Sequence, residues 1–278
     1  MANEMNEWKA YVGRIVLFPG APVLSPPSAL ELYRRVWGTD PDNFQKQANP
    51  LMPTLAQGTH SGMTTSCMTH PSRIDFSLTP LSPTDEVAQL SFRLIEDTSQ
   101  LRAELTTITD AIGNGIVSDS VVRVALNVHF LTVKPSPAKA NEVLTKIIPA
   151  QYGVRITNEE DFIFQINRPY MSRKVEATKV NSITKWSVER LQVLTFAFPM
   201  IGAPISAPAN AVPPKPLTAA FTGASVTFDI NNAPMESPIL LSGEQQSLLL
   251  REALTTVVQV QRDIGLNVEG FQNDKLSH

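Results

Sequence analysis

The chain has 278 residues, of which 42% are hydrophobic and 18% are charged, and its net charge is −3. This length allows one large domain or two small ones with a buried core, and the composition excludes a largely disordered chain. The slightly negative charge excludes an overall positive field that would draw the protein to nucleic acid or to an anionic membrane.

The cysteine content and the apolar pattern predict a cytoplasmic location. Cys67 is the single cysteine, so no intrachain disulfide forms, which is typical of a reducing compartment. Residues 1–9 lack the basic stretch and apolar run of a secretory signal. No apolar stretch reaches 18 uninterrupted residues, so we expect no transmembrane helix and no membrane partner.

The first part of the chain predicts a strand, a short helix, further strands and a long helix. Residues 11–18 are an apolar run of the kind found in buried strands. Ser28 opens a Ser-x-x-Glu capping box, which predicts a helix over 28–36. Residues 54–79 alternate small, polar and apolar side chains and predict two or three antiparallel strands. An apolar stripe with helical spacing then predicts a long helix over 84–113.

A similar order of elements follows. Residues 120–133 alternate as a long strand, and a Ser-Pro pair at 136–137 predicts a helix that reaches 148. Residues 161–168 predict another strand. Residues 175–198 predict two strands with a break near 186–189.

The end of the chain predicts a loop, a strand and a helix. Residues 200–223 are rich in proline and alanine and predict a long loop. Residues 225–231 alternate as a strand. Ser242 and Gln245 have the spacing of a capping box, which predicts a second long helix over 242–266.

The two parts, 1–113 and 114–278, therefore follow one β-α-β-β-β-α order, and we interpret them as pseudo-repeated halves. The Arg-Ile-Val-Leu segment at 14–17 matches Arg-Val-Ala-Leu at 123–126. The predicted fold class is α+β, with a mostly antiparallel sheet, or sheets, and long helices packed on one face. The possible linker, 114–118, is short, which favours one merged globular unit.

This element order resembles a sporadically distributed bacterial protein family of unknown function, whose members have two tandem β-α-β-β-β-α units. The corresponding arginine-containing strand here is 121–130, and the closing strand is 225–231. The resemblance implies a fold and no mechanism. The sporadic distribution implies a bacterial, defence-related or mobile gene setting.

Motifs for catalysis and cofactor binding are absent from the sequence. Neither a phosphate-binding glycine loop nor a nucleophile elbow occurs. His60, Cys67 and His70 lie close in sequence, but on one strand Cys67 and His70 point to opposite faces and cannot share a metal ion. A Cys67–His129 nucleophile pair stays open as an alternative. We expect no metal and no cofactor, and we lean against an enzyme.

Polar side chains on one face of strand 120–133 predict a ligand or partner face. Arg123, Asn127 and His129 share the face opposite the apolar residues and need partners if that face is covered. Basic and aromatic residues further along the chain are expected to add to it. The predicted face consists of Arg123, Asn127, His129, Arg168, Lys174 and Trp186. An ordinary solvated sheet face is the alternative.

The proline-rich loop is the second candidate site. Loops of this length are uncommon unless they are functional or disordered, and this one carries apolar residues with little charge. We interpret it as a partner-docking loop; a cover for the protein's own core is the alternative. Its candidate contact residues are Ile201, Ile205, Val212, Leu217 and Phe221.

The leading functional hypothesis is a non-catalytic binding or assembly protein that takes a protein partner or self-associates into an oligomer. It would belong to a bacterial multi-protein, defence-related system. One alternative is a nucleotide- or RNA-binding module that uses the sheet face. The other is an enzyme whose unfamiliar site is assembled from distant residues.

Overall fold

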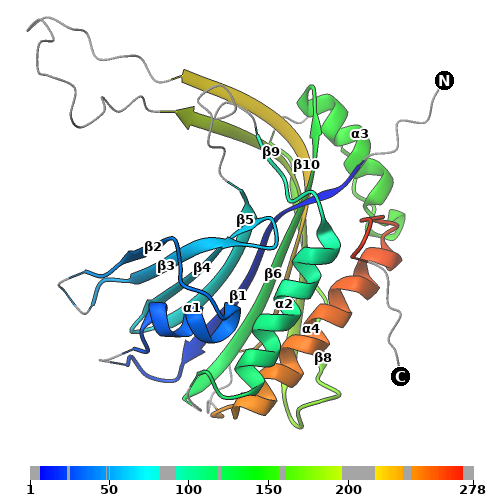
Figure 1. Cartoon of the computed structure of the whole chain (residues 1–278). Helices are drawn as coiled ribbons and strands as arrows, with labels where there is room; N and C mark the ends of the chain where they lie inside the picture. Colours follow the sequence, from blue (N-terminus) through cyan, green and yellow to red (C-terminus); the bar gives the residue numbers. More distant parts are fainter. Residues whose placement is uncertain are drawn as a thin grey trace, which may run out of the picture.

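A single antiparallel sheet with helices packed against it forms the protein (Figure 1). In the described part of the chain, the sheet has ten strands and the α-helices number four, so the fold is α+β, as predicted. The computed structural model describes residues 7–23, 26–47, 49, 51–81, 92–117, 120–156, 161–195, 217–233 and 239–271.

The elements follow the chain in two series. The first series is β1 (Lys9–Pro19), α1 (Ala29–Trp37), β2 (Asn43–Gln45), β3 (Thr54–His60), β4 (Met63–His70), β5 (Arg73–Pro80) and α2 (Thr98–Gly113). The second series is β6 (Val121–Lys134), α3 (Pro137–Ile147), a 3-10 turn (Ala150–Tyr152), β7 (Ile163–Asn167), β8 (Tyr170–Met171), β9 (Lys179–Thr195), β10 (Leu217–Asn232) and α4 (Gly243–Asp263).

The two series meet at the centre of the sheet. The strand order is β2-β3-β4-β5-β1-β6-β10-β9-β7, and β8 pairs with β9 beside this path. β1 and β6 are antiparallel neighbours in which Arg14 lies opposite Asn127. This pairing joins the strands of both series into one sheet and gives each of the two central strands a partner on both sides. Descent of the two series from one duplicated unit stays a prediction.

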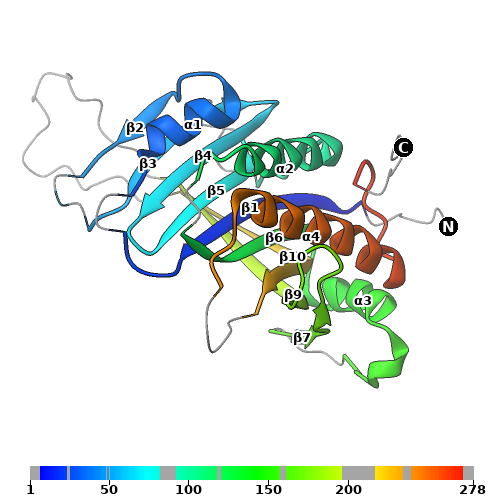
Figure 2. The ribbon, with the colours of Figure 1, turned by 90° about the horizontal axis from the view of Figure 1, so that it is seen from below.

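The helices all cover the same face of the sheet (Figure 2). α1 lies over β3 and β4, α2 over β1, α4 over β6 and β10, and α3 over β9 and β10. Phe76, Phe130 and Phe228 point from the sheet into this helix layer and are fully buried. No helix in the described part of the chain combines the length and the apolar character that crossing a membrane requires.

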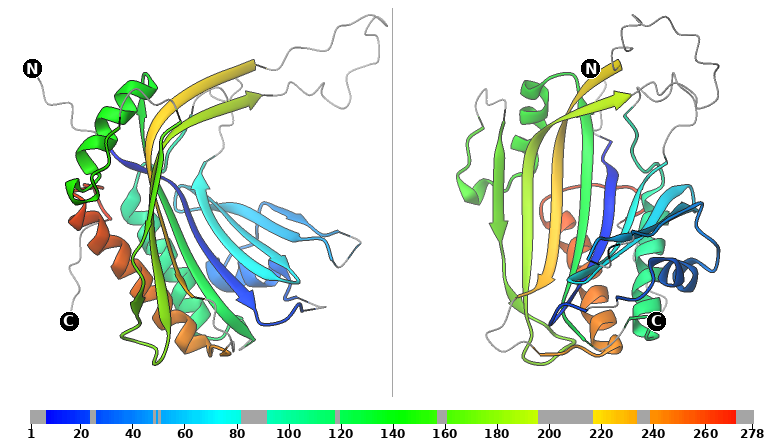
Figure 3. Two further views of the ribbon diagram at one scale, coloured as in Figure 1. Left: turned by 180° about the vertical axis from the view of Figure 1, so that it is seen from behind. Right: turned by 90° about the vertical axis from the view of Figure 1, so that its left-hand side faces the viewer.

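The sheet is strongly curved. The end of β9 and the start of β10 bend away from the helices (Figure 3). β2 to β5 also turn away from the plane of β6, β10 and β9. Among the described residues, no helix lies between the bent ends of β9 and β10 and the strands β2 to β5. In the described part of the chain, the sheet therefore has one curved face without a helical cover.

Helix capping explains where the helices start. In α4, the Ser242 side chain accepts from Gln245 N, and the Gln245 side chain accepts from Ser242 N, which confirms the predicted capping box. In α3, Ser136 Oγ accepts from Lys139 N, as the Ser-Pro pair predicts. Ser28 precedes α1, but its side chain makes no capping hydrogen bond, so the capping box predicted there is wrong.

α2 begins much later than its apolar stripe predicted. Asp97 is the N-cap, and its carboxylate accepts from the amides of Ser99 and Gln100. Just before it, Ile95 N donates to Ala10 O in an isolated bridge, which commits this segment to extended backbone. The predicted start at residue 84 lies outside the described residues, and residues 92–97 are not helical.

The last two strands differ from the prediction. β9 runs without the predicted break near 186–189, because β10 pairs with it along one side and β7 along part of the other. β10 starts at Leu217 and pairs with β9 from there, so the end of the predicted loop is a strand. Residues 196–216 lie outside the described residues.

Candidate binding face

The side of the sheet that faces away from the helices is called the open face below. Alternate residues of each strand point to it. Its clearest feature is a row of directly opposed residues that crosses eight strands, from β3 to β7. The row consists of Gln57, Ser66, Ser77, Arg14, Asn127, Asp229, Ile183 and Asn167.

This row is polar at every position except Ile183. Directly opposed residues in a sheet have Cβ atoms about 4.5–5.5 Å apart. A ligand lying across the strands therefore meets one polar side chain after another. The regular spacing comes from the antiparallel register alone.

An arginine–aspartate cluster lies on β5 and β1. The Asp75 side chain is 3% exposed. Arg14 donates to Asp75 Oδ1 from Nε at 3.0 Å and from Nη2 at 2.5 Å. Arg73 Nε is 2.8 Å from Asp75 Oδ2, in an ion pair without hydrogen-bond geometry. Two guanidinium groups thus share one carboxylate, and part of their positive charge faces the open side.

A ladder of amide side chains lies on β7, β9 and β10. Asn167 Nδ2 donates to Asn181 Oδ1 at 3.1 Å, and Asn181 Nδ2 donates to Asn231 Oδ1 at 3.3 Å. Asn231 Nδ2 donates to Asp229 Oδ1 at 2.9 Å. The ladder fixes the orientation of these side chains and ends on a carboxylate opposite Asn127.

Glu189 collects three polar groups on the open face. Its Oε1 accepts from Ser225 Oγ at 2.8 Å and from Ser187 Oγ at 3.2 Å. His129 Nε2 is 3.4 Å from the same oxygen and has no hydrogen-bond partner among the described residues. Burial lowers the pKa of His129, Lys185 lowers it further, and the negative charge of Glu189 opposes both effects.

This group does not have the arrangement of a serine nucleophile. Both serine hydroxyls donate to Glu189 or to each other, whereas a serine nucleophile needs an imidazole that takes its proton. His129 Nε2 faces the carboxylate and not a hydroxyl. The arrangement therefore suits binding and hydrogen bonding better than acyl transfer.

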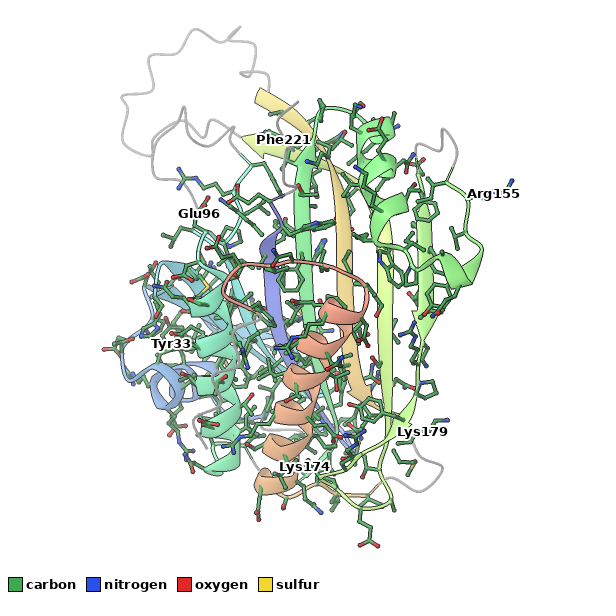
Figure 4. All side chains as sticks on the ribbon, turned by 90° about the vertical axis from the view of Figure 1, so that its right-hand side faces the viewer. Tyr33, Glu96, Arg155, Lys174, Lys179 and Phe221 are labelled. Carbon is green, nitrogen blue, oxygen red and sulfur yellow. The ribbon has the colours of Figure 1, made fainter. Side chains whose placement is uncertain are left out.

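Aromatic rings extend the open face from His129 toward the start of β10. Tyr11 meets His129 edge-on, with ring centroids 5.4 Å apart. Phe92 lies 5.3 Å from Tyr11, and Phe221 lies 5.6 Å from Phe92. Figure 4 places Phe221 near the start of β10, where this strand bends away from the helices. Phe221 was predicted in a loop, and its position in β10 corrects that prediction.

Three of the predicted face residues lie together. Arg123, Asn127 and His129 occupy alternate positions of β6 on the open face, as their spacing indicated. The Arg123 guanidinium lies over the Phe18 ring, 5.2 Å from its centroid. The signal that found these residues is the period-two pattern of a strand buried on its other face.

The other three predicted residues lie elsewhere. Trp186 is 1% exposed, points into the helix layer and stacks on Phe164, so a ligand on the open face cannot reach it. The Arg168 guanidinium lies over the ring of Tyr152, which packs against the core. Lys174 lies beside α4 (Figure 4). Trp186 faces the helices because it alternates along β9 with the residues that point to the open face. Arg168 and Lys174 follow β7 and lie outside the strands.

The predicted loop residues are partly outside the described chain. Ile201, Ile205 and Val212 fall outside the described residues. Leu217 belongs to β10, where its backbone pairs with Thr195 of β9. Its placement in a loop was therefore wrong.

The cysteine and the histidines do not form a site in the described part of the chain. Cys67 is fully buried toward the helices, and burial raises the pKa of its thiol far above the usual value. His129 points to the opposite face, so a Cys67–His129 nucleophile pair is wrong. His60 Nδ1 is 3.0 Å from Glu104 on α2. No group of three potential metal ligands occurs within the described residues.

Comparison of the sequence with protein-family models and with curated proteins finds no match. The resemblance to a two-unit bacterial family therefore stays a prediction, and the functional argument depends on the geometry of the open face.

Proposed function

We propose that the protein is a non-catalytic binding protein whose open face holds a surface of a partner protein. The observation that carries this proposal is the asymmetry of the sheet. Its one face is covered by four helices, whereas its other face, over the described strands, presents an ordered row of polar side chains without a helix. Antiparallel sheets can expose one face to water, and this face is therefore accessible to a second protein.

The charges of the open face favour a protein over a nucleic acid. Binding a polyanion depends on Lys and Arg side chains that neutralise its phosphates. Here cations and carboxylates alternate, and Asp75 already engages two arginines. The charged residues of the central part are Arg14, Arg73, Arg123 and Lys185 against Asp75, Asp229 and Glu189. A partner surface of mixed charge complements this pattern.

The aromatic residues supply the apolar part of such an interface. Tyr11, Phe92 and Phe221 lie in a continuous chain of ring contacts beside the polar row. Buried aromatic side chains contribute much of the binding free energy in protein–protein interfaces. Fixed polar groups next to aromatic anchors give both affinity and orientation.

Site-specific crosslinking tests the proposal. A photoreactive benzoylphenylalanine replaces Thr227, which lies on the open face between His129 and Lys185. The same residue replaces Lys146 on α3 as a control. We expect crosslinks in the native host to one discrete protein from position 227 and none from position 146. A second copy of this chain as that protein would support the same role through self-assembly.

Purified components make the test quantitative. Ser77→Trp places a bulky ring in the polar row between Ser66 and Arg14, and Lys146→Trp is the matched control. Calorimetry with the crosslinked partner should show at least tenfold weaker binding for Ser77→Trp and unchanged binding for the control. Crosslinks to RNA alone, or equal crosslinking from both positions, would contradict the proposal. Membership of a defence-related assembly is part of the proposal, and the identity of the partner tests it.

A further inference from the structure

A groove lies on the helix side of the molecule, away from the open face. It runs between α4 and the segment that contains β8 and residues 172–174, and its volume is about 680 Å³. This volume is within the range of small-molecule sites, which is about 300–1,000 Å³. The groove shares none of its lining residues with the open face.

One face of α4 forms a wall of the groove. The lining residues of this helix recur every three or four positions, from Leu248 through Thr255 to Val260. They therefore form a stripe about 18 Å long at 1.5 Å rise per residue. Leu248 and Val260 give the two ends of the stripe an apolar character, while the residues between them are polar or charged.

Hydrogen bonds fix the opposite wall. Tyr170 Oη is hydrogen-bonded to Thr256 Oγ1 at 2.9 Å. Ser172 Oγ donates to Glu252 Oε2 at 2.6 Å, and Arg173 N donates to Glu252 Oε1 at 3.0 Å. These three bonds hold the segment against α4, so the groove exists before any ligand enters it.

Two positively charged side chains of the groove have no ion-pair partner in the described part of the chain. The Arg173 and Lys174 side chains line it, and neither has an ion-pair partner among the described residues. Glu252 accepts hydrogen bonds from the Ser172 hydroxyl and from the Arg173 backbone amide, which are neutral groups, so it contributes one negative charge to the lining. Arg251 pairs with Asp110 at 2.8 Å. Arg173 and Lys174 are thus available to an anionic group.

We propose that this groove binds a small organic anion. A phosphate or carboxylate group would lie against Arg173 and Lys174, and the body of the molecule would extend along the α4 stripe, with apolar contacts to Leu248 and Val260 at its two ends. Two observations support this inference. The groove is long enough for a molecule larger than an inorganic ion. Its two cations without an ion-pair partner among the described residues outnumber the single carboxylate of Glu252, which favours a negatively charged ligand.

Titration of the purified full chain with five probes tests this site. Adenosine monophosphate and octanoate are anions with an aromatic and an aliphatic body. Adenosine and octanamide are their uncharged counterparts, and inorganic phosphate has the charge without the body. We expect calorimetric binding of at least one of the two organic anions. Its affinity should exceed that of its neutral counterpart, and that of inorganic phosphate, by tenfold or more.

Two variants locate the binding. Arg173→Gln with Lys174→Gln removes both charges, and should weaken binding of the anion about tenfold while leaving the weak binding of its neutral counterpart unchanged. Thr255→Trp, at an exposed position of the stripe, should fill the groove and abolish binding. Lys139→Gln with Lys146→Gln on α3 is the charge-matched control and should not weaken binding.

The outcomes are distinct. Binding of neither organic anion would overturn the proposal. If the Arg173/Lys174 double variant and Thr255→Trp both bind the anion as strongly as the unchanged protein does, the proposal is also overturned, since the ligand then lies elsewhere. A preference for adenosine monophosphate or for octanoate would identify an aromatic or an aliphatic source of the anion.

Discussion

His129 and Glu189 meet across an intervening strand. His129 belongs to β6 and Glu189 to β9, with β10 between them, yet His129 Nε2 is 3.4 Å from Glu189 Oε1. Ser225 of β10 donates to the same oxygen. The contact connects β6 with β9 over the open face. The pKa of the imidazole therefore depends on the negative charge of Glu189 as well as on burial.

The first prediction concerns the pH dependence of stability. The pKa of His129 in the folded state is below its usual value of 6.5, mainly because the ring is buried. Below this usual value the unfolded chain therefore binds more protons at His129 than the folded protein does. The contribution to stability is present above pH 6.5 and is lost as the pH falls toward the pKa of the folded state.

Urea denaturation at several pH values between 5 and 7.5 measures this effect. The free energy of unfolding should fall from neutral to acidic pH, and His129→Gln should flatten part of that slope. His70→Gln is the control, since His70 lies at the end of β4 away from this contact. An unchanged slope in His129→Gln would refute the prediction, whatever its effect on stability at neutral pH.

The second prediction compares two arginine–aspartate pairs. Asp75→Asn removes the buried carboxylate that holds Arg14 and Arg73, and we expect a loss of about 2 kcal/mol in the free energy of unfolding. The two arginines are partly exposed, which keeps the loss below that of a fully buried cluster. Asp40→Asn breaks an exposed pair with Arg34 and should cost less than about 0.5 kcal/mol. Equal losses in urea denaturation would contradict the argument from burial.

The sequence predicts the face of the sheet better than the contacts on it. The period-two pattern places Arg123, Asn127 and His129 on one face, because the opposite positions of β6 are apolar. His129 and Glu189 are 60 positions apart in the sequence. They meet only because β6 pairs with β10, and β10 with β9, in one particular register. Local pattern contains no information on that register, so Glu189 and Ser225 were missed.

The errors in the predicted elements have local causes. The apolar stripe of α2 continues through Leu94, but the Asp97 cap and the Ile95–Ala10 bridge decide where the helix begins. Trp186 was assigned to the binding face because aromatic residues near arginine and lysine suggest stacking on bases. Its strand position instead directs it into the helix layer, where Phe164 and the core cover it.

The third prediction tests helix capping with two serines. Ser242→Ala removes the side chain that caps α4 and should lower the free energy of unfolding by about 1 kcal/mol. Ser28→Ala makes the same change at the start of α1, where the serine makes no capping hydrogen bond, and should cost only a few tenths of a kcal/mol. Thermal and urea denaturation of both variants provide the comparison. A larger loss from Ser28→Ala would show that capping does not explain the difference between these helix starts.

The fourth prediction concerns the contact between β1 and α2. A Cβ atom at Gly13 would lie 2.6 Å from Leu101 Cδ1, so Gly13→Ala overpacks the core and should cost about 1–3 kcal/mol of the free energy of unfolding. Leu101→Ala alone leaves a cavity at a fully buried position and should cost about 2–4 kcal/mol.

The double variant separates overpacking from a loss of strand flexibility. When Leu101 is already alanine, the added methyl group at position 13 enters the vacated space. The loss in Gly13→Ala/Leu101→Ala should therefore be smaller than the sum of the two single losses by about 1 kcal/mol or more. Additive losses in urea denaturation would mean that the glycine is needed for its backbone and not for the close approach of α2, because a backbone requirement would persist after Leu101 is shortened.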